Sequence, residues 1–304
     1  MFSGQTRTGV HISERKIQYI ELLIENAGVQ IVDIGEFNFN ENIDFSKIKE
    51  TIVQEILVAA LDSKLFANRK YSTIVSFALP LNVFKFFTSY NCSQFDFKEH
   101  LAFHRWEMQL LYPKIDFSDL IFSFANVQDT ILFGKNRKIV AAGNRNLFHF
   151  LTTLCKKNKM RIGAFDFAHF AFDKAVKYLN DGFPDGISAT IYYNDKSVSI
   201  ELFLNGDTIF HKVIPRPLDT DEFLFDPKIL DNELKVASGL VRRLFVCRES
   251  DPDKDLKILA SDNLEIIDLK LTDEIVISED NSRILRRSDI NYILPACGIV
   301  LRQP

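Results

Sequence analysis

Residues 16–22 read KIQYIEL, and residues 196–202, 180 positions further on, read KSVSIEL. At this offset a lysine, an isoleucine, a glutamate and a leucine recur at matching positions, and both stretches follow a polar turn. The surrounding order also repeats: a strand, a short polar turn, a strand, a tight turn, a strand and then a helix. Self-similarity at a fixed offset indicates a duplicated architecture. The sequence therefore predicts an α/β chain of two similar halves, each with a β-β-β-α-β-α plan.

The hydrophobic pattern places the elements of both halves. In the first half it predicts strands at 10–12, 17–24, 29–34, 71–79, 83–90, 117–127, 130–133, 138–142 and 160–165, and helices at 46–65, 97–112, 144–158 and 167–179. In the second half it predicts strands at 189–193, 198–204, 208–214 and 256–260, helices at 221–245 and 262–269, and a closing helix or strand–helix pair within 288–301. The turn formers of 181–186 predict a boundary between halves at 1–182 and 183–304.

Charge and hydropathy exclude several classes of function. The 304 residues carry 37 Lys and Arg against 41 Asp and Glu, a formal net charge of −4. No basic excess is present to bind nucleic acid or an anionic membrane. The longest apolar run, 293–301, is far shorter than the roughly 20 residues that span a bilayer. We therefore expect a protein that is cytoplasmic, or peripheral to the inner membrane through a partner, with no nucleic-acid partner and no direct insertion into the membrane.

Several collinear stretches carry a family resemblance. They are Gly9–Ile12 (GVHI), Phe77–Pro80 (FALP), His104–Glu107 (HRWE) with Tyr112-Pro113, Gly143–Asp166, and Pro295–Arg302 (PACGIVLR). The duplicated plan resembles that of the actin, Hsp70 and sugar-kinase superfamily. With these motifs the chain resembles the PilM family, the actin-like component of type IV pilus assembly. The resemblance implies an actin-like (ribonuclease H-like) fold with two halves around a cleft, and a small α/β subdomain inserted at about 77–128.

The same resemblance implies a function. A groove at the inserted subdomain would receive the tail of a membrane-anchored pilus or secretion-type protein, and the chain would act as a scaffold that can self-associate. Two alternatives stay open: an active ATP-binding and hydrolysing relative, and an orphan actin-fold protein without a pilus role.

The superfamily's nucleotide motifs are altered here. Its two phosphate hairpins need Asp and Gly, because a Cβ at the glycine positions collides with the ligand. In the first hairpin these positions hold His11 and Ser13, followed by Glu14, whose charge repels phosphate. In the second hairpin the alignment leaves a one-residue choice, with Ile191 or Tyr192 at the Asp position and Tyr193 or Asn194 at the Gly position.

The adenosine turn would fall at 259–263, which holds no glycine. We therefore regard His11, Ser13, Glu14, Tyr192 and Asn194 as degenerate phosphate-loop positions. We expect no catalytic residue, no bound metal and no cofactor. Binding of ATP and magnesium remains the less favoured expectation.

Three other patterns have simpler interpretations. His100, His104 and Glu107 share one face of a predicted helix, and an amphipathic helix with exposed polar residues explains them better than a metal site. Asp251, Asp253 and Asp255 begin like a calcium loop but lack its glycine, which favours a solvated turn. The run 83–87 (VFKFF) has apolar residues on both faces and predicts a strand buried twice, either within a packed core or against a partner.

Overall fold

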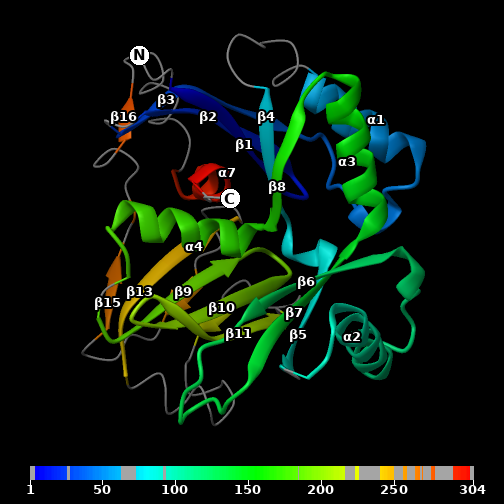
Figure 1. The fold of residues 1–304 in the computed structure, drawn as a ribbon. Helices are drawn as coiled ribbons and strands as arrows, with labels where there is room; N and C mark the ends of the chain where they lie inside the picture. The colour runs from blue at the N-terminus through cyan, green and yellow to red at the C-terminus, as the bar shows by residue number, and fades with distance from the viewer. Residues whose placement is uncertain are drawn as a thin grey trace.

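The computed structural model contains two mixed sheets with the same strand order. It describes residues 4–25, 28–62, 73–91, 94–183, 185–215, 223–225, 240–249, 256–258, 264–267, 269, 275–277 and 290–301. In the first sheet the order β3-β2-β1-β4-β8 is continued by β16, and the second sheet has the order β11-β10-β9-β13-β15 (Figure 1). Both begin with an antiparallel meander and continue with parallel strands. The duplication predicted from residues 16–22 and 196–202 is therefore present.

The strands of the two sheets have these bounds. The first sheet comprises β1 (Gln5–Ile12), β2 (Lys16–Glu25), β3 (Gly28–Asn38), β4 (Ile74–Leu79), β8 (Arg161–Phe167) and β16 (Ile275–Ile277). The second comprises β9 (Ile187–Tyr193), β10 (Ser197–Leu204), β11 (Asp207–Pro215), β13 (Val241–Arg248) and β15 (Glu265–Ile267). A separate pair joins β12 (Phe223–Phe225) to β14 (Leu256–Ile258).

Helices cover the first sheet on both faces. The outer face, which is turned away from the second sheet, packs on α1 (Thr51–Leu61) and α3 (Arg145–Lys157). Leucines of these helices form one core with Val10, Ile12 and Phe77. Asn144 caps α3 by accepting a hydrogen bond from the Asn146 backbone N–H. The inner face packs on α4 (Ala168–Leu179) and α7 (Ile290–Leu301), and this core also takes in Tyr192 and Phe245 of the second sheet.

Helix α7 lies between the two sheets at the centre of the molecule, beside α4 (Figure 1). Two glycines make this position possible. A Cβ on Gly9 of β1 would lie 1.9 Å from the Ala296 carbonyl oxygen, and a Cβ on Gly298 would lie 1.8 Å from the Ala171 carbonyl oxygen. Only glycine permits backbones to approach so closely. The helix is therefore held against β1 on one side and α4 on the other.

A three-stranded antiparallel sheet is inserted between β4 and α3. Its order is β5-β7-β6, with β5 (Phe84–Tyr90), β7 (Arg137–Asn144) and β6 (Leu120–Asn126), and α2 (Phe97–Leu111) packs on one face. The domain boundaries expected from the sequence stay predictions. However, the middle strand β7 lies beyond the expected end of the insertion at residue 128. The insertion's sheet is complete only at Asn144.

The phenylalanine-rich strand β5 is packed on both faces within the chain. Phe84 and Phe86 contact Phe167 of β8, with ring centroids 5.8 and 4.5 Å apart. On the opposite face Phe87 packs in the small core under α2. The double burial predicted for residues 83–87 is therefore explained by the main body of the same chain.

Three predicted elements differ in the structure. The expected helix at 221–245 is contradicted by strands β12 and β13, while 226–239 lie outside the described residues. The expected helix at 262–269 is contradicted by β15, which extends the second sheet in parallel. The expected strand at 130–133 is a turn with a single bridge between Thr130 and Gly134. In the first two cases sheet pairing with distant residues overrides local periodicity.

No helix in the described part of the chain combines the length and the apolar character needed to cross a bilayer.

Replacing Gly298 by alanine tests the packing of α7. In an unconstrained helix alanine is more favourable than glycine by about 1 kcal/mol. Here the added methyl overlaps the Ala171 carbonyl, and overpacking costs about 1–3 kcal/mol. We expect Gly298→Ala to lower the free energy of unfolding, as measured by urea denaturation. A stability equal to or above that of wild type would contradict the close approach of α7 to α4.

Candidate functional site

The turns of the two equivalent hairpins contact each other directly. The β1–β2 turn carries Glu14 and Arg15, and the β9–β10 turn carries Asp195 and Lys196. The Arg15 guanidinium pairs with the Asp195 carboxylate, and Lys196 Nζ lies 2.7 Å from Glu14 Oε1. Arg15 and Asp195 are 180 positions apart and therefore occupy equivalent places in the repeat. The two halves are thus joined by opposite charges at their matching turns.

Beneath these ion pairs lies a buried chain of hydrogen bonds. His11 of β1 and Tyr192 of β9 are 2% and 0% exposed, and His11 Nε2 lies 3.1 Å from the Tyr192 hydroxyl. That hydroxyl donates to Glu249 Oε2 at 2.6 Å, immediately after β13. Because the tyrosine proton goes to Glu249, His11 Nε2–H is the donor to the tyrosine oxygen. The chain therefore links the inner faces of both sheets.

Two small polar residues hold the turns in shape. Ser13 Oγ donates to the Lys16 carbonyl and accepts from the Lys16 backbone N–H, both at 3.0 Å. Asn194 Oδ1 accepts from the backbone N–H groups of Lys196 and Ser197 at 2.9 Å. These side chains occupy the turns where the superfamily's phosphate hairpins need glycine. Their hydrogen bonds are local turn contacts.

The structure brings together all five residues singled out in the sequence, His11, Ser13, Glu14, Tyr192 and Asn194. Sequence reasoning missed Arg15, Asp195, Lys196 and Glu249. A signal for the first three exists, since Glu14-Arg15 and Asp195-Lys196 have complementary charges in matching turns. Glu249 follows β13, part of which the sequence predicted as helix, and no sequence pattern indicates that it belongs to the site. The expected adenosine turn at 259–263 lies outside the described residues.

Burial changes the protonation of Glu249. Desolvation of its carboxyl raises the pKa of Glu249 to about 7, although the hydrogen bond from Tyr192 acts to lower the pKa. The negative charges of Glu14 and Asp195 add to the increase. The carboxyl is consequently protonated in the folded protein over a pH range in which an unfolded glutamate is ionised.

A large cavity opens beside the inserted sheet. Its volume is about 1310 Å³, and it lies between the sheet face opposite α2, the strands β8 and β10, and helix α4. The cavity has this volume because several residues on this face of the inserted sheet are small: Ser123 and Ala125 of β6, and Ala141 and Gly143 of β7. Lys174 and Lys177 of α4 line the other wall. Within the described residues β6 pairs with β7 alone, so its other edge borders no strand.

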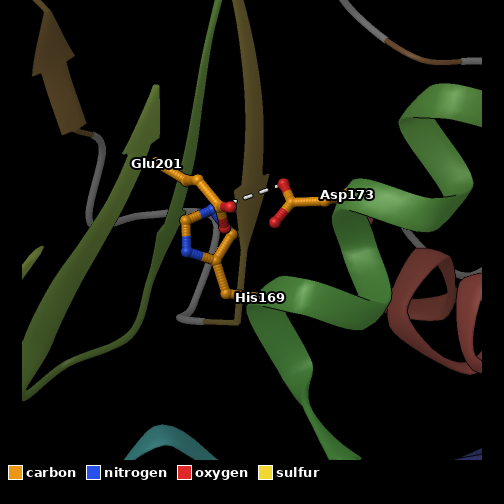
Figure 2. Close-up of side chains that lie close together, drawn as sticks. All are labelled: His169, Asp173 and Glu201. Atoms are coloured by element: carbon orange, nitrogen blue, oxygen red, sulfur yellow. Dashed lines mark ion pairs between the residues drawn. The ribbon is translucent and has the colours of Figure 1, made fainter. Parts of the chain in front are cut away.

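A second buried polar cluster adjoins this cavity. His169 and Asp173 project from α4 toward Glu201 of β10 (Figure 2). His169 Nδ1 lies 2.7 Å from Ser199 Oγ, and His169 Nε2 lies 2.9 Å from Thr190 Oγ1 and 3.6 Å from Asp173 Oδ1. Burial holds the pKa of His169 well below its usual value. The cluster lies under the second sheet, apart from the hairpin turns.

The helix α2 histidines are packed inside the inserted subdomain. His104 is fully buried, with its Nδ1 2.8 Å from Glu107 Oε2, and Ser89 Oγ donates to the same carboxylate at 2.6 Å. The expectation that these polar residues are all exposed is therefore wrong for His104, whose burial is supported by the hydrogen bond of its Nδ1 to Glu107, while its Nε2 has no hydrogen-bond partner within the described residues. Desolvation lowers the pKa of His104. Asp251, Asp253 and Asp255 lie outside the described residues.

Comparison with solved structures shows the fold of the chain. The chain aligns with a structure described as the PilM–PilN type IV pilus biogenesis complex at a TM-score of 0.67 and 12% identity, over 98% of this chain and 99% of that chain. A Bacteroides thetaiotaomicron protein of unknown function with an actin-like ATPase fold aligns at 0.50 and 10% identity, over 97% and 96%. The chain therefore has the mixed α/β actin-like ATPase fold that the sequence predicted.

A further similar structure is the cytoplasmic domain of EpsL, an inner membrane component of the type II secretion system of Vibrio cholerae. It aligns at a TM-score of 0.47 and 11% identity, over 99% of this chain and 97% of that chain. No protein-family model matches the chain. No curated protein matches it either.

Removing the tyrosine hydroxyl tests the buried chain. Tyr192→Phe deletes both hydrogen bonds of that hydroxyl while keeping the ring that packs in the core. Loss of hydrogen bonds between buried groups costs about 1–3 kcal/mol. We expect the free energy of unfolding to fall by this amount in urea denaturation. The control Tyr90→Phe changes an exposed tyrosine at the end of β5 and should leave stability within about 0.5 kcal/mol of wild type. Equal stabilities of Tyr192→Phe and wild type would contradict the hydrogen-bonded link.

The raised pKa of Glu249 predicts a pH dependence. Because the folded protein retains this proton up to about pH 7 and the unfolded chain releases it near pH 4.5, the Glu249 contribution to the free energy of unfolding decreases as pH rises from 4.5 to 7. Glu249→Gln keeps an acceptor for Tyr192 and removes the titration. We expect the difference in stability between Glu249→Gln and wild type to grow in favour of the variant over this range. Glu55→Gln, at an exposed position on α1, is the control. A pH-independent difference for Glu249→Gln would refute the assignment.

Proposed function

We propose that this chain is a non-catalytic actin-like scaffold that binds the tail of a membrane-anchored protein at the cytoplasmic face of a pilus or secretion-type assembly. The observation that carries the proposal is the direct contact between the two hairpin turns. The likeness to the PilM–PilN structure over nearly the whole of both chains supports a role in a pilus or secretion-type assembly.

The hairpin junction supports a scaffold that does not hydrolyse ATP. In the superfamily the phosphates lie between two hairpins that offer backbone N–H groups and glycines. Here side chains from both hairpins pair with each other at the matching turns. A nucleotide would have to separate Arg15 from Asp195 and Lys196 from Glu14. It would also meet the Glu14 carboxylate, whose charge repels phosphate.

The cavity beside the inserted sheet supports binding of an extended tail. An exposed strand edge can pair with an added strand through backbone hydrogen bonds, while pockets beside it select side chains. The β6 edge and the small residues on its cavity face offer both features. The lining carries charges of both signs, which suits a tail with polar residues among apolar ones. These charged residues are Lys174, Lys177, Asp166, Asp173, Asp181 and Glu201. This mode of recognition requires no nucleotide.

Filling the cavity tests the binding proposal. Ser123 is exposed on the cavity face of β6, so Ser123→Trp places a large ring in the groove without removing core atoms. Fluorescein-labelled synthetic peptides with the cytoplasmic tail sequences of single-span membrane proteins encoded beside this gene are the probes. We expect saturable fluorescence anisotropy with wild type and at least tenfold weaker binding with Ser123→Trp.

The matched control is Thr153→Trp, at an exposed position of α3 outside the cavity lining. It should bind the same peptide as tightly as wild type does. Two results would contradict the proposal: wild type that binds none of these peptides, or a Ser123→Trp variant that binds with unchanged affinity.

A further inference from the structure

The buried cluster His169, Asp173 and Glu201 has the composition of a metal site. The three residues are 0%, 6% and 2% exposed. One ligand atom from each lies within 4.8 Å of the others, and Figure 2 shows the three side chains converging from α4 and β10. His169 and Asp173 are four positions apart on the helix, a spacing that places both on one face. The cluster is separate from the hairpin turns and does not depend on the proposed function.

Several oxygen atoms in the cluster lack a hydrogen bond of normal geometry, although Thr190 and Glu201 lie near Asp173. Neither carboxylate oxygen of Asp173 accepts a hydrogen bond, and Glu201 Oε2 accepts none. The other Glu201 oxygen, Oε1, accepts from Thr208 Oγ1 at 2.5 Å. Buried polar atoms are almost always paired, because an unpaired buried charge is very unfavourable. The arrangement therefore calls for a positively charged species between the two carboxyl groups.

No side chain of the cluster supplies that charge. Burial lowers the pKa of both His169 and His211, so each ring is neutral. Burial and mutual repulsion raise the pKa of Glu201, and burial raises that of Asp173 to about 7. Either a shared proton or a bound cation can stabilise the pair.

The neighbours of His169 orient its ring for metal binding. Its Nδ1 lies 2.7 Å from Ser199 Oγ, and Ser199 Oγ lies 3.1 Å from His211 Nε2. When Nδ1–H donates to Ser199 and Ser199 donates to His211, His169 Nε2 is unprotonated and accepts a hydrogen bond from the Thr190 hydroxyl, which a metal ion at Nε2 would have to displace. Histidines that bind metals commonly donate their second N–H to such an outer partner.

We propose that His169 Nε2, Asp173 and Glu201 bind one divalent transition-metal ion, of which Zn²⁺ and Mn²⁺ are the test cases. One imidazole and two carboxylates favour these ions over calcium or magnesium, which prefer all-oxygen sites. Asp173 and Glu201 both line the 1310 Å³ cavity, so an ion can enter from that side. Three protein ligands leave a coordination position open toward the cavity.

Metal titration of the tag-free full chain tests this site. After dialysis against EDTA and its removal, Zn²⁺ and Mn²⁺ are titrated separately by isothermal calorimetry, and Co²⁺ is added as a spectroscopic probe. We expect one tight ion per chain and a rise in thermal midpoint that follows metal concentration. A visible Co²⁺ absorption band that Zn²⁺ displaces is expected as well. Asp173→Asn, Glu201→Gln and His169→Gln should each weaken binding at least tenfold.

The matched control is Glu107→Gln, which changes the other buried histidine–carboxylate pair and should leave the affinity unchanged. Wild type without a stoichiometric site would overturn the proposal and assign the carboxyl pair to a shared proton. Unchanged affinity in all three cluster variants would also overturn it. Because the wild-type titration and the Co²⁺ spectrum need no variant, the test does not depend on the folding of the substituted proteins.

Discussion

The contact between the two hairpin turns is the interaction on which the arrangement of the molecule depends. Glu14 and Arg15 reach across to Lys196 and Asp195, and His11 joins Tyr192 beneath them. The exposed ion pairs stabilise the contact by only about 0–1 kcal/mol each. The buried hydrogen bonds that link His11, Tyr192 and Glu249 contribute more to the free energy of unfolding, because their groups are removed from water. The duplicated halves are therefore joined directly at their matching turns.

Helices α4 and α7 lie between the two sheets, and their core includes residues of both halves of the chain. Gly9 and Gly298 let α7 pack directly on β1 and on α4. Helix α4 in turn carries the wall of the cavity and two residues of the buried His169–Asp173–Glu201 cluster. Helix α4 thus borders the core that contains Tyr192, the cavity beside the inserted sheet and the candidate metal site.

Local patterns predicted the first half of the fold well and the later second half poorly. The meanders and helices α2, α3 and α4 have clear apolar periodicity, so their positions follow from the sequence. Strand β13 and strand β15 were predicted as helix, because their pairing partners are distant in sequence and their local pattern is ambiguous. The hairpin residues were found through the resemblance, as the positions that match the superfamily's phosphate motifs. Glu201 was noticed only as a repeat marker, since its approach to His169 and Asp173 depends on tertiary packing.

Binding of Mg-ATP tests the central claim most directly. The account holds that side-chain contacts between the hairpins occupy the space that a triphosphate needs. Isothermal calorimetry of the wild-type chain with millimolar Mg-ATP should therefore show no saturable heat, and the thermal midpoint should not move. Saturable binding at one nucleotide per chain, accompanied by release of phosphate, would show that the hairpins separate and would contradict the account.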